Sequence, residues 1–206
     1  GLGKIIAGKS IVGQFFESAV LTAGKDVQAT YLLNCQLKAN GKLLVEGRKG
    51  VIIGGKTCAK LGISCNGIGN IAEIATVVSV GIDKEDMTAY QELQKKIEQT
   101  QAELQTCENG LNKLMANPVH DEKVSMMIQR LTRAVYTLKS SRKELFSERN
   151  AQMEQMTKQK EARIQVSGRA YPGTLLFLNE DPFAIKEIYN NVEFVKHDNR
   201  IDTLAH

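Results

Sequence analysis

The chain has 206 residues, of which 42% are hydrophobic and 24% are charged, and its formal net charge is +4. This composition supplies enough apolar residues for a sizeable core, which excludes a wholly disordered chain. The mild positive charge does not by itself indicate binding to nucleic acid or to a membrane. No apolar run of about 18 residues is present to cross a bilayer, so we expect a cytoplasmic protein without a transmembrane segment. The chain also lacks an initiator Met and starts within a repeat, and we therefore expect a fragment of a longer protein.

A Gly-Lys pair recurs along the first third of the chain. The pairs begin at Gly8, Gly24, Gly41 and Gly55, and the spacing is 16, 17 and 14 residues. Such a period, with short runs rich in Val, Ile and Leu between the pairs, predicts strands of about four residues that stack in parallel about 4.8 Å apart. We predict a parallel β-helix with corners at these four glycines, because glycine tolerates positive φ or a close approach between turns. The lysines should point outward, and an anion- or partner-binding ladder is the alternative reading of their column.

The segment after the fourth pair contains a sequence that imitates a nucleotide site. Gly67, Gly69 and Ala72 match the relaxed dinucleotide-binding fingerprint, which requires a helix directly after it. Residues 74–81 are short and β-branched and predict a strand instead. We therefore expect no nucleotide site here.

The period changes to a helical one after Gly81. Two heptad seams, separated by a turn at Pro118, predict an antiparallel coiled-coil hairpin. The first helix, of about 33 residues, would form an arm of about 50 Å. The seams consist of Leu93, Ile97, Thr100, Leu104, Cys107, Leu111 and Leu114, and of Val124, Ile128, Leu131, Val135, Leu138, Arg142 and Leu145.

The two predicted helices differ in charge. Residues 84–116 contain four basic and six acidic residues, whereas residues 122–163 contain ten basic and five acidic ones. Opposite charges on facing helices favour pairing within the hairpin, which would explain the charge difference without any binding partner. The excess of basic residues on the second helix could instead bind an acidic protein partner. The candidate partner-binding residues are Arg130, Arg133, Lys139, Arg142 and Lys143.

The β pattern returns in the tail, with a turn at Pro172 and Gly173. We expect the tail to rejoin the β-helix and cap it, since an open end presents unpaired strand edges. The predicted fold is mainly β with a long α-helical hairpin: a parallel β-helix (residues 1–83), an antiparallel coiled coil (residues 84–163) and a C-terminal β segment (residues 164–206).

The order of these elements resembles the flagellar assembly protein A family of bacteria. The resemblance rests on the rungs of residues 17–56, the closing IATVVSVGID, the heptad hairpin and the tail RIQVSGRAYPGTLLF, and it covers nearly all of the chain. It implies a right-handed β-helix, a cytoplasmic location and a part in flagellum assembly or placement. The N-terminal domain typical of the family has no counterpart here, and the resemblance brings no catalytic residues.

Three functions compete on this sequence. We expect a non-enzymatic scaffold that binds protein partners and could form a homo-oligomer through the coiled coil. The alternatives are a bactofilin-like polymerising cytoskeletal element and a nucleic-acid-binding module, although a base-stacking platform would need more aromatics than Tyr136. We predict no catalytic, cofactor or metal site and no small-molecule substrate, because the acids of the rungs stand singly and Cys and His lack the spacing of a zinc site.

Overall fold

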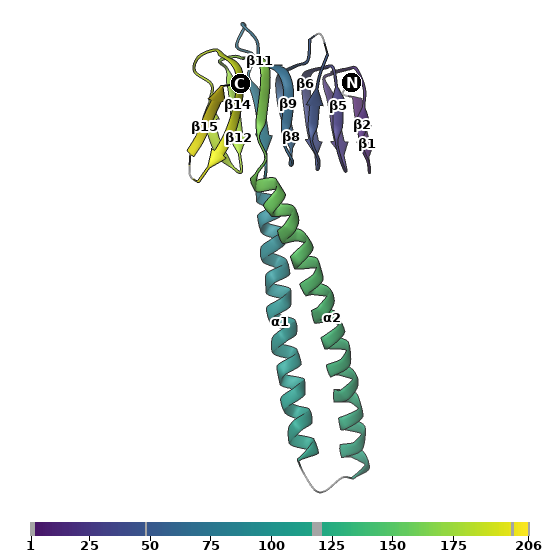
Figure 1. Ribbon diagram of the computed structural model, residues 1–206. Coiled ribbons are helices and arrows are strands. Elements are labelled where there is room, and N and C mark those ends of the chain that lie inside the picture. The colour runs from purple at the N-terminus through teal and green to yellow at the C-terminus, as the bar shows by residue number, and fades with distance from the viewer. Residues whose placement is uncertain (1–2, 48, 117–120, 199, 206) are drawn as a thin grey trace. The chain divides into compact units, whose positions relative to one another are not determined.

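The computed structural model describes residues 3–47, 49–116, 121–198 and 200–205 (Figure 1). They form two compact units, one made of Gly1–Lys84 with Met156–His206 and the other of Glu85–Gln155. The first unit is a parallel β-solenoid and the second is a helical hairpin inserted into its sequence. The predicted fold class, a β-helix interrupted by helices, is confirmed.

The solenoid stacks its strands on three faces. The first face consists of β1 (Gly3–Ala7), β4 (Ala19–Ala23), the second half of β6 (Tyr31–Ala39), the second half of β8 (Val51–Ala59), β10 (Thr76–Val80) and β12 (Thr174–Leu178). The second face consists of β2 (Ile11–Val12), β5 (Val27–Ala29), β7 (Leu43–Val45) and the first halves of β9 (Ile63–Ile68) and β11 (Ile164–Ala170). The third face consists of β3 (Phe15–Glu17), the first halves of β6 and β8, and the ends of β9 and β11.

Alternate residues of each strand build one continuous core. On the second face, Leu43 stacks on Ile63 and Ile63 stacks on Ile164, with exposed fractions of 0%, 3% and 0%. Each turn therefore buries its apolar residues against the turns before and after it, as expected for a stacked repeat. The hydrophobic free energy gained from this burial, about 25 cal/mol per Å² of apolar surface, holds the turns together.

Gly55 does not lie at the same corner as the other three glycines of the Gly-Lys pairs. Gly8, Gly24 and Gly41 lie in bends between strands, whereas Gly55 lies within β8 and pairs with Cys35 of β6. Gly55 instead follows Gly54 at the corner between the third and the first face, where its φ is 73°. The reason for this shift is that the third turn is longer, because more residues separate β7 from β8 than β5 from β6.

Positive φ occurs at a different corner from the one that the Gly-Lys pairs mark. Ser18, Asn34 and Gly54 have φ values of 46°, 51° and 70°, and each lies where the chain passes from the third face to the first. Gly8, Gly24 and Gly41 are not among the residues with positive φ. The chain therefore turns within one residue at Ser18 and at Asn34, and within two at Gly54, because Gly55 also has a positive φ; β6 and β8 run across these corners.

The helical hairpin consists of α1 (Lys84–Met115) and α2 (Glu122–Lys160). The seam residues Leu93, Ile97 and Leu104 of α1 are buried, and Val135 is the corresponding buried residue of α2. The predicted turn at Pro118 lies outside the described residues. The second helix ends at Lys160 rather than near Arg163, because Ala162 is already 4% exposed within the solenoid core.

The tail rejoins the solenoid and then reverses. Strands β11 and β12 add parallel pairs to β9 and β10. The strands that follow run antiparallel, namely β13 (Asp181–Ala184) on β12, β14 (Tyr189–His197) on β11 and β15 (Arg200–Ala205) on β14. Phe183, Tyr189 and Phe194 pack against one another here, with ring centroids 5.6 to 6.3 Å apart. The return of the chain to cap the stack is confirmed.

Candidate functional site

Two of the five candidate partner-binding residues contact α1 within the hairpin. Lys139 Nζ of α2 lies 2.8 Å from Glu108 Oε1 of α1. Arg142 Nη1 donates a hydrogen bond of 2.8 Å to Gln101 Oε1. These contacts join the two helices, as expected if opposite charges pair within the hairpin.

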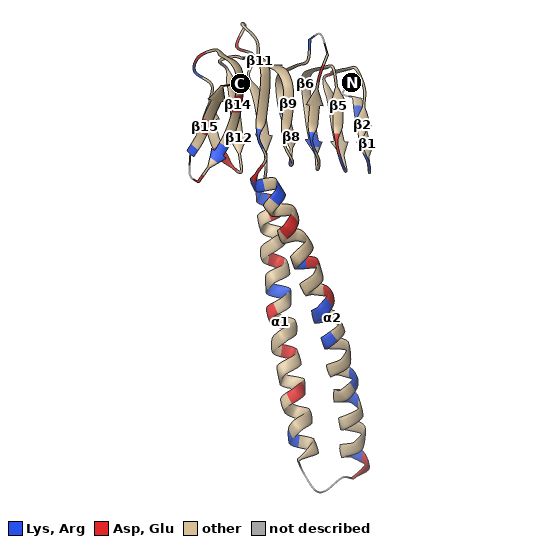
Figure 2. Cartoon of the chain, viewed as in Figure 1, with Lys and Arg blue, Asp and Glu red and all other residues tan. Residues whose placement is uncertain are grey.

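The other three candidate residues take no part in this pairing. Arg130, Arg133 and Lys143 are exposed, and within the described part of the chain none of them makes an ion pair or a side-chain hydrogen bond. Figure 2 shows charges of both signs on each helix, and Lys and Arg outnumber Asp and Glu on α2. The basic excess of α2 is therefore only partly used to hold the helices together.

Large apolar side chains accompany these free cations. Met126 is 51% exposed and Tyr136 is 78% exposed. At 100° per residue, positions 126, 130, 133 and 136 fall on one side of α2, opposite the seam that contains Val135. We call this surface the outer face of α2; it consists of Met126, Arg130, Arg133 and Tyr136, and the exposed acids Glu122 and Glu144 lie on the same side.

The two ends of the hairpin meet at one side chain of the solenoid. Asn179, directly after β12, accepts a hydrogen bond of 2.9 Å from the Ile82 amide on its Oδ1. Its Nδ2 donates a hydrogen bond of 3.1 Å to the Lys160 carbonyl. One amide group therefore binds Ile82, two residues before α1 begins, and Lys160, the last residue of α2.

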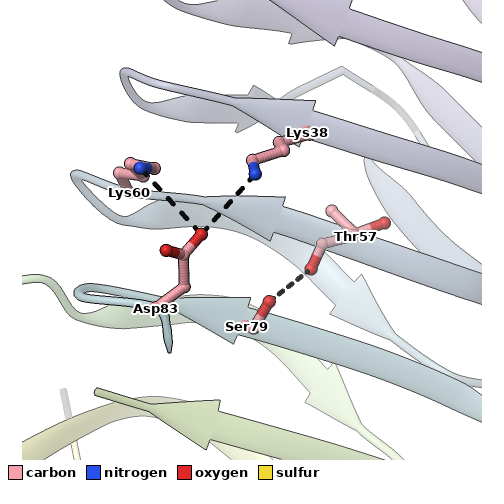
Figure 3. Close-up of polar contacts among 5 residues, drawn as sticks. All are labelled: Lys38, Thr57, Lys60, Ser79 and Asp83. Atoms are coloured by element: carbon pink, nitrogen blue, oxygen red, sulfur yellow. Dashed lines mark hydrogen bonds and ion pairs between the residues drawn. The ribbon is translucent and has the colours of Figure 1, made fainter. Parts of the chain in front are cut away.

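A second contact fixes the entry into α1. Asp83 precedes the first residue of α1, and its Oδ2 lies 3.7 Å from Lys38 Nζ and 3.9 Å from Lys60 Nζ (Figure 3). Nearby, Ser79 Oγ donates a hydrogen bond of 3.5 Å to the Thr57 carbonyl, which joins β10 to β8. Lysines from two successive turns thus neutralise one carboxylate at the start of the helix.

The sequence reading missed both Asn179 and Asp83. Asp immediately before a helical pattern is a common start signal, and it could have identified Asp83. Asn179 carried no comparable signal, because its partners lie 97 and 19 residues away. The predicted corner lysines Lys9, Lys25 and Lys42 are exposed, as expected.

The cysteines behave as small apolar residues in the core and at its edge. Cys35 and Cys65 are buried, and Cys58 and Cys107 are partly exposed; all four are free thiols. Burial raises the pKa of the Cys65 thiol to about 12, because the thiolate would lose its hydration, and a backbone hydrogen bond at Gly67 offsets this only in part. Cys65 is therefore a protonated, inert thiol at neutral pH.

The described residues contain neither a metal-binding group nor a membrane-spanning helix. No group of three or more His, Cys, Asp or Glu residues among them is placed to hold a metal ion. Neither of the described helices combines the length and the apolar character needed to cross a membrane.

Comparison with known proteins gave one family. The model of the Flagellar Assembly Protein A beta solenoid domain matches residues 1–201. No curated protein and no solved structure matched the chain.

Proposed function

The chain belongs to the Flagellar Assembly Protein A family, and we propose that its part in flagellar assembly is that of a non-enzymatic scaffold in the cytoplasm. The β-solenoid serves as a rigid platform, and the helical hairpin binds an acidic protein partner through α2.

The unused charge of α2 carries this proposal. A hairpin held together only by its own charges would pair its basic residues with acids of α1, as Lys139 does with Glu108. Arg130 and Arg133 instead face outward beside Met126 and Tyr136. Arginine next to exposed aromatic and methionine side chains is typical of protein interfaces.

The solenoid suits the role of a platform. Its parallel strands pair with a strand on either side from β4 to β10, so the backbone hydrogen bonds of these turns are satisfied within the stack. Each turn contacts only its neighbours, and the surface is therefore regular and rigid.

A double charge reversal tests the proposal in a flagellated bacterium that encodes the protein. Arg130→Glu with Arg133→Glu should reduce the number of flagella or misplace them, because the acidic partner would be repelled. Flagella are counted and located by electron microscopy, and the purified variant should keep the melting temperature of the wild type.

The matched control is Lys95→Glu with Lys96→Glu, which reverses two exposed charges on α1. This control should leave flagella unchanged. Normal flagella in the Arg130 and Arg133 variant would contradict the assignment of the binding site to α2.

A further inference from the structure

We propose that the outer side of the third face of the solenoid binds the same surface of a second copy of the chain, so that two solenoids pair face to face about a two-fold axis. This surface belongs to the solenoid unit and shares no residue with the outer face of α2.

Apolar side chains cover the outer side of the third face. Leu32 and Ile52 point into the core and are 1% and 0% exposed, so the residues on either side of each point outward. These outward residues are half-buried, and Phe15 in the preceding turn is 65% exposed, with its ring 6.4 Å from that of Tyr31. The apolar residues of this surface are Phe15, Tyr31, Leu33, Val51 and Ile53. A contiguous apolar surface on a folded chain marks an interaction site.

The two ends of this surface carry opposite charges. It is built of five rows of residues, one from each successive turn, in the order β3, β6, β8, β9 and β11. Glu17 stands in the first row and Arg169 in the fifth. Both are exposed, and among the described residues neither side chain makes an ion pair or a hydrogen bond. The middle row contributes Val51 and Ile53, so an acid and a base lie about 10 Å on either side of an apolar centre.

A two-fold axis parallel to the strands and above β8 makes this pattern complementary to itself. The first row then faces the fifth row of the second copy. Glu17 lies about 7 Å from Arg169 along the strand direction, a distance that an arginine side chain spans, and this contact occurs at both ends. Val51 packs on its own equivalent. At the rim, the loop before β8 carries the exposed Glu46 and Lys49, so each copy also offers both signs of charge near the axis. Such self-complementarity is the property of a two-fold interface between identical chains.

The remaining rows avoid a collision between bulky side chains. The fourth row carries Gly67, with Gly69 two residues further on. The same axis places Tyr31 and Leu33, from the second row of the other copy, opposite these two glycines. Large residues of one copy therefore face a row of the other copy that has no side chains of its own at these positions. The order of the rows thus favours a second copy of this chain as the occupant.

Sedimentation velocity of the full chain tests the pairing. At micromolar concentrations the wild type should sediment with the mass of two chains, twice 22.7 kDa, and form no larger species. Val51→Glu places two carboxylates against each other at the centre and should return the mass to that of one chain. The matched control is Val77→Glu, because Val77 is a half-buried, outward valine of β10 on the first face. This control should remain a dimer.

A charge swap identifies the second copy as the occupant. Glu17→Arg places arginine against Arg169 of the other copy, and Arg169→Glu places glutamate against Glu17. Each variant alone should therefore dimerise about tenfold or more weakly than the wild type. An equimolar mixture of the two variants should recover the wild-type association, because both end contacts then join an acid to a base. The double variant Glu17→Arg with Arg169→Glu should also dimerise like the wild type.

Four other results would overturn the proposal. A wild type with the mass of one chain would exclude a second copy as the occupant. A dimer that persists in Val51→Glu and in both single charge variants would place the contact elsewhere, for example in the helical hairpin. Loss of the dimer in Val77→Glu as well would show that the effect is not specific to the third face. A mixture that associates no better than either charge variant alone would contradict the two-fold arrangement.

Discussion

Gly8 and Gly24 occupy equivalent corners of successive turns, but a side chain would meet different surroundings at each. A Cβ atom at Gly8 would have no atom within 4 Å, whereas one at Gly24 would collide with the Gly8 carbonyl oxygen. Gly24→Ala should therefore destabilise the solenoid by about 1–3 kcal/mol, because backbone must shift to make room. Urea unfolding followed by circular dichroism measures this change.

Gly8→Ala is the matched control and should change the free energy of unfolding by less than about 0.5 kcal/mol. Equal effects of the two substitutions would show that the approach between turns does not select glycine at Gly24.

The pattern of glycines revealed stacked turns but not which residues bend them. At Gly41 the sequence allowed either positive φ or close approach, and the structure shows close approach: Asp26 Oδ1 accepts a hydrogen bond of 2.8 Å from the Lys42 amide and leaves no room for a Cβ atom. The residues with positive φ include Ser18 and Asn34. Neither is a glycine, so a search for glycines could not find this column.

At the scale of elements, Asn179 binds the two chain segments that flank the hairpin, at Ile82 and at Lys160. Asn179→Gly removes both side-chain hydrogen bonds while tolerating the φ of 51° at this position. The amide of Ile82 should then exchange its hydrogen faster, and the free energy of unfolding should fall by about 1–3 kcal/mol. Hydrogen exchange with mass spectrometry on peptides that contain Ile82 measures the first effect.

Asn179→Asp separates the two hydrogen bonds, because the carboxylate still accepts from Ile82 but cannot donate to the Lys160 carbonyl. We expect protection at Ile82 to be retained in this variant. Fast exchange in Asn179→Asp and wild-type exchange in Asn179→Gly would together contradict the role assigned to this residue.

The helices were predictable because their signal is local. Heptad spacing identified α1 and α2 and their seam, with boundaries that differ by one residue at the end of α1 and by three at the end of α2. The end of α2 depends on tertiary contacts, since Lys160 is bound by Asn179 and Ala162 enters the core. Sequence periodicity contains no information on such distant partners.

At the scale of the whole chain, the capped end of the solenoid argues against growth into a polymer. The last strands run antiparallel to the stack, and β13 contains Pro182, which has no amide to donate to a further strand. The mass measured by light scattering should therefore stay constant over a concentration series. Mass that rises steadily with concentration would instead favour the bactofilin-like alternative.

The distribution of charge along the chain identified the candidate residues but not which of them contact α1. The basic excess of α2 was evident from composition, and all five candidate residues lie on α2. The sequence did not show that Lys139 and Arg142 contact α1 whereas the other three residues face outward. This division depends on the rotation of α2 about its axis, which a count of charges does not contain.

The insertion of the hairpin has a consequence for the order in which the chain acquires its structure during synthesis. Contacts between β8 and β10 span 22 residues, whereas those between β9 and β11 span 100. The early turns can thus form during synthesis. The turn that contains β11 forms later, because the long loop between β9 and β11 must close first. The hairpin shortens that delay, because its own nearby contacts bring Ile164 back towards Ile63. Formation of the hairpin therefore also accelerates the pairing of β11 with β9.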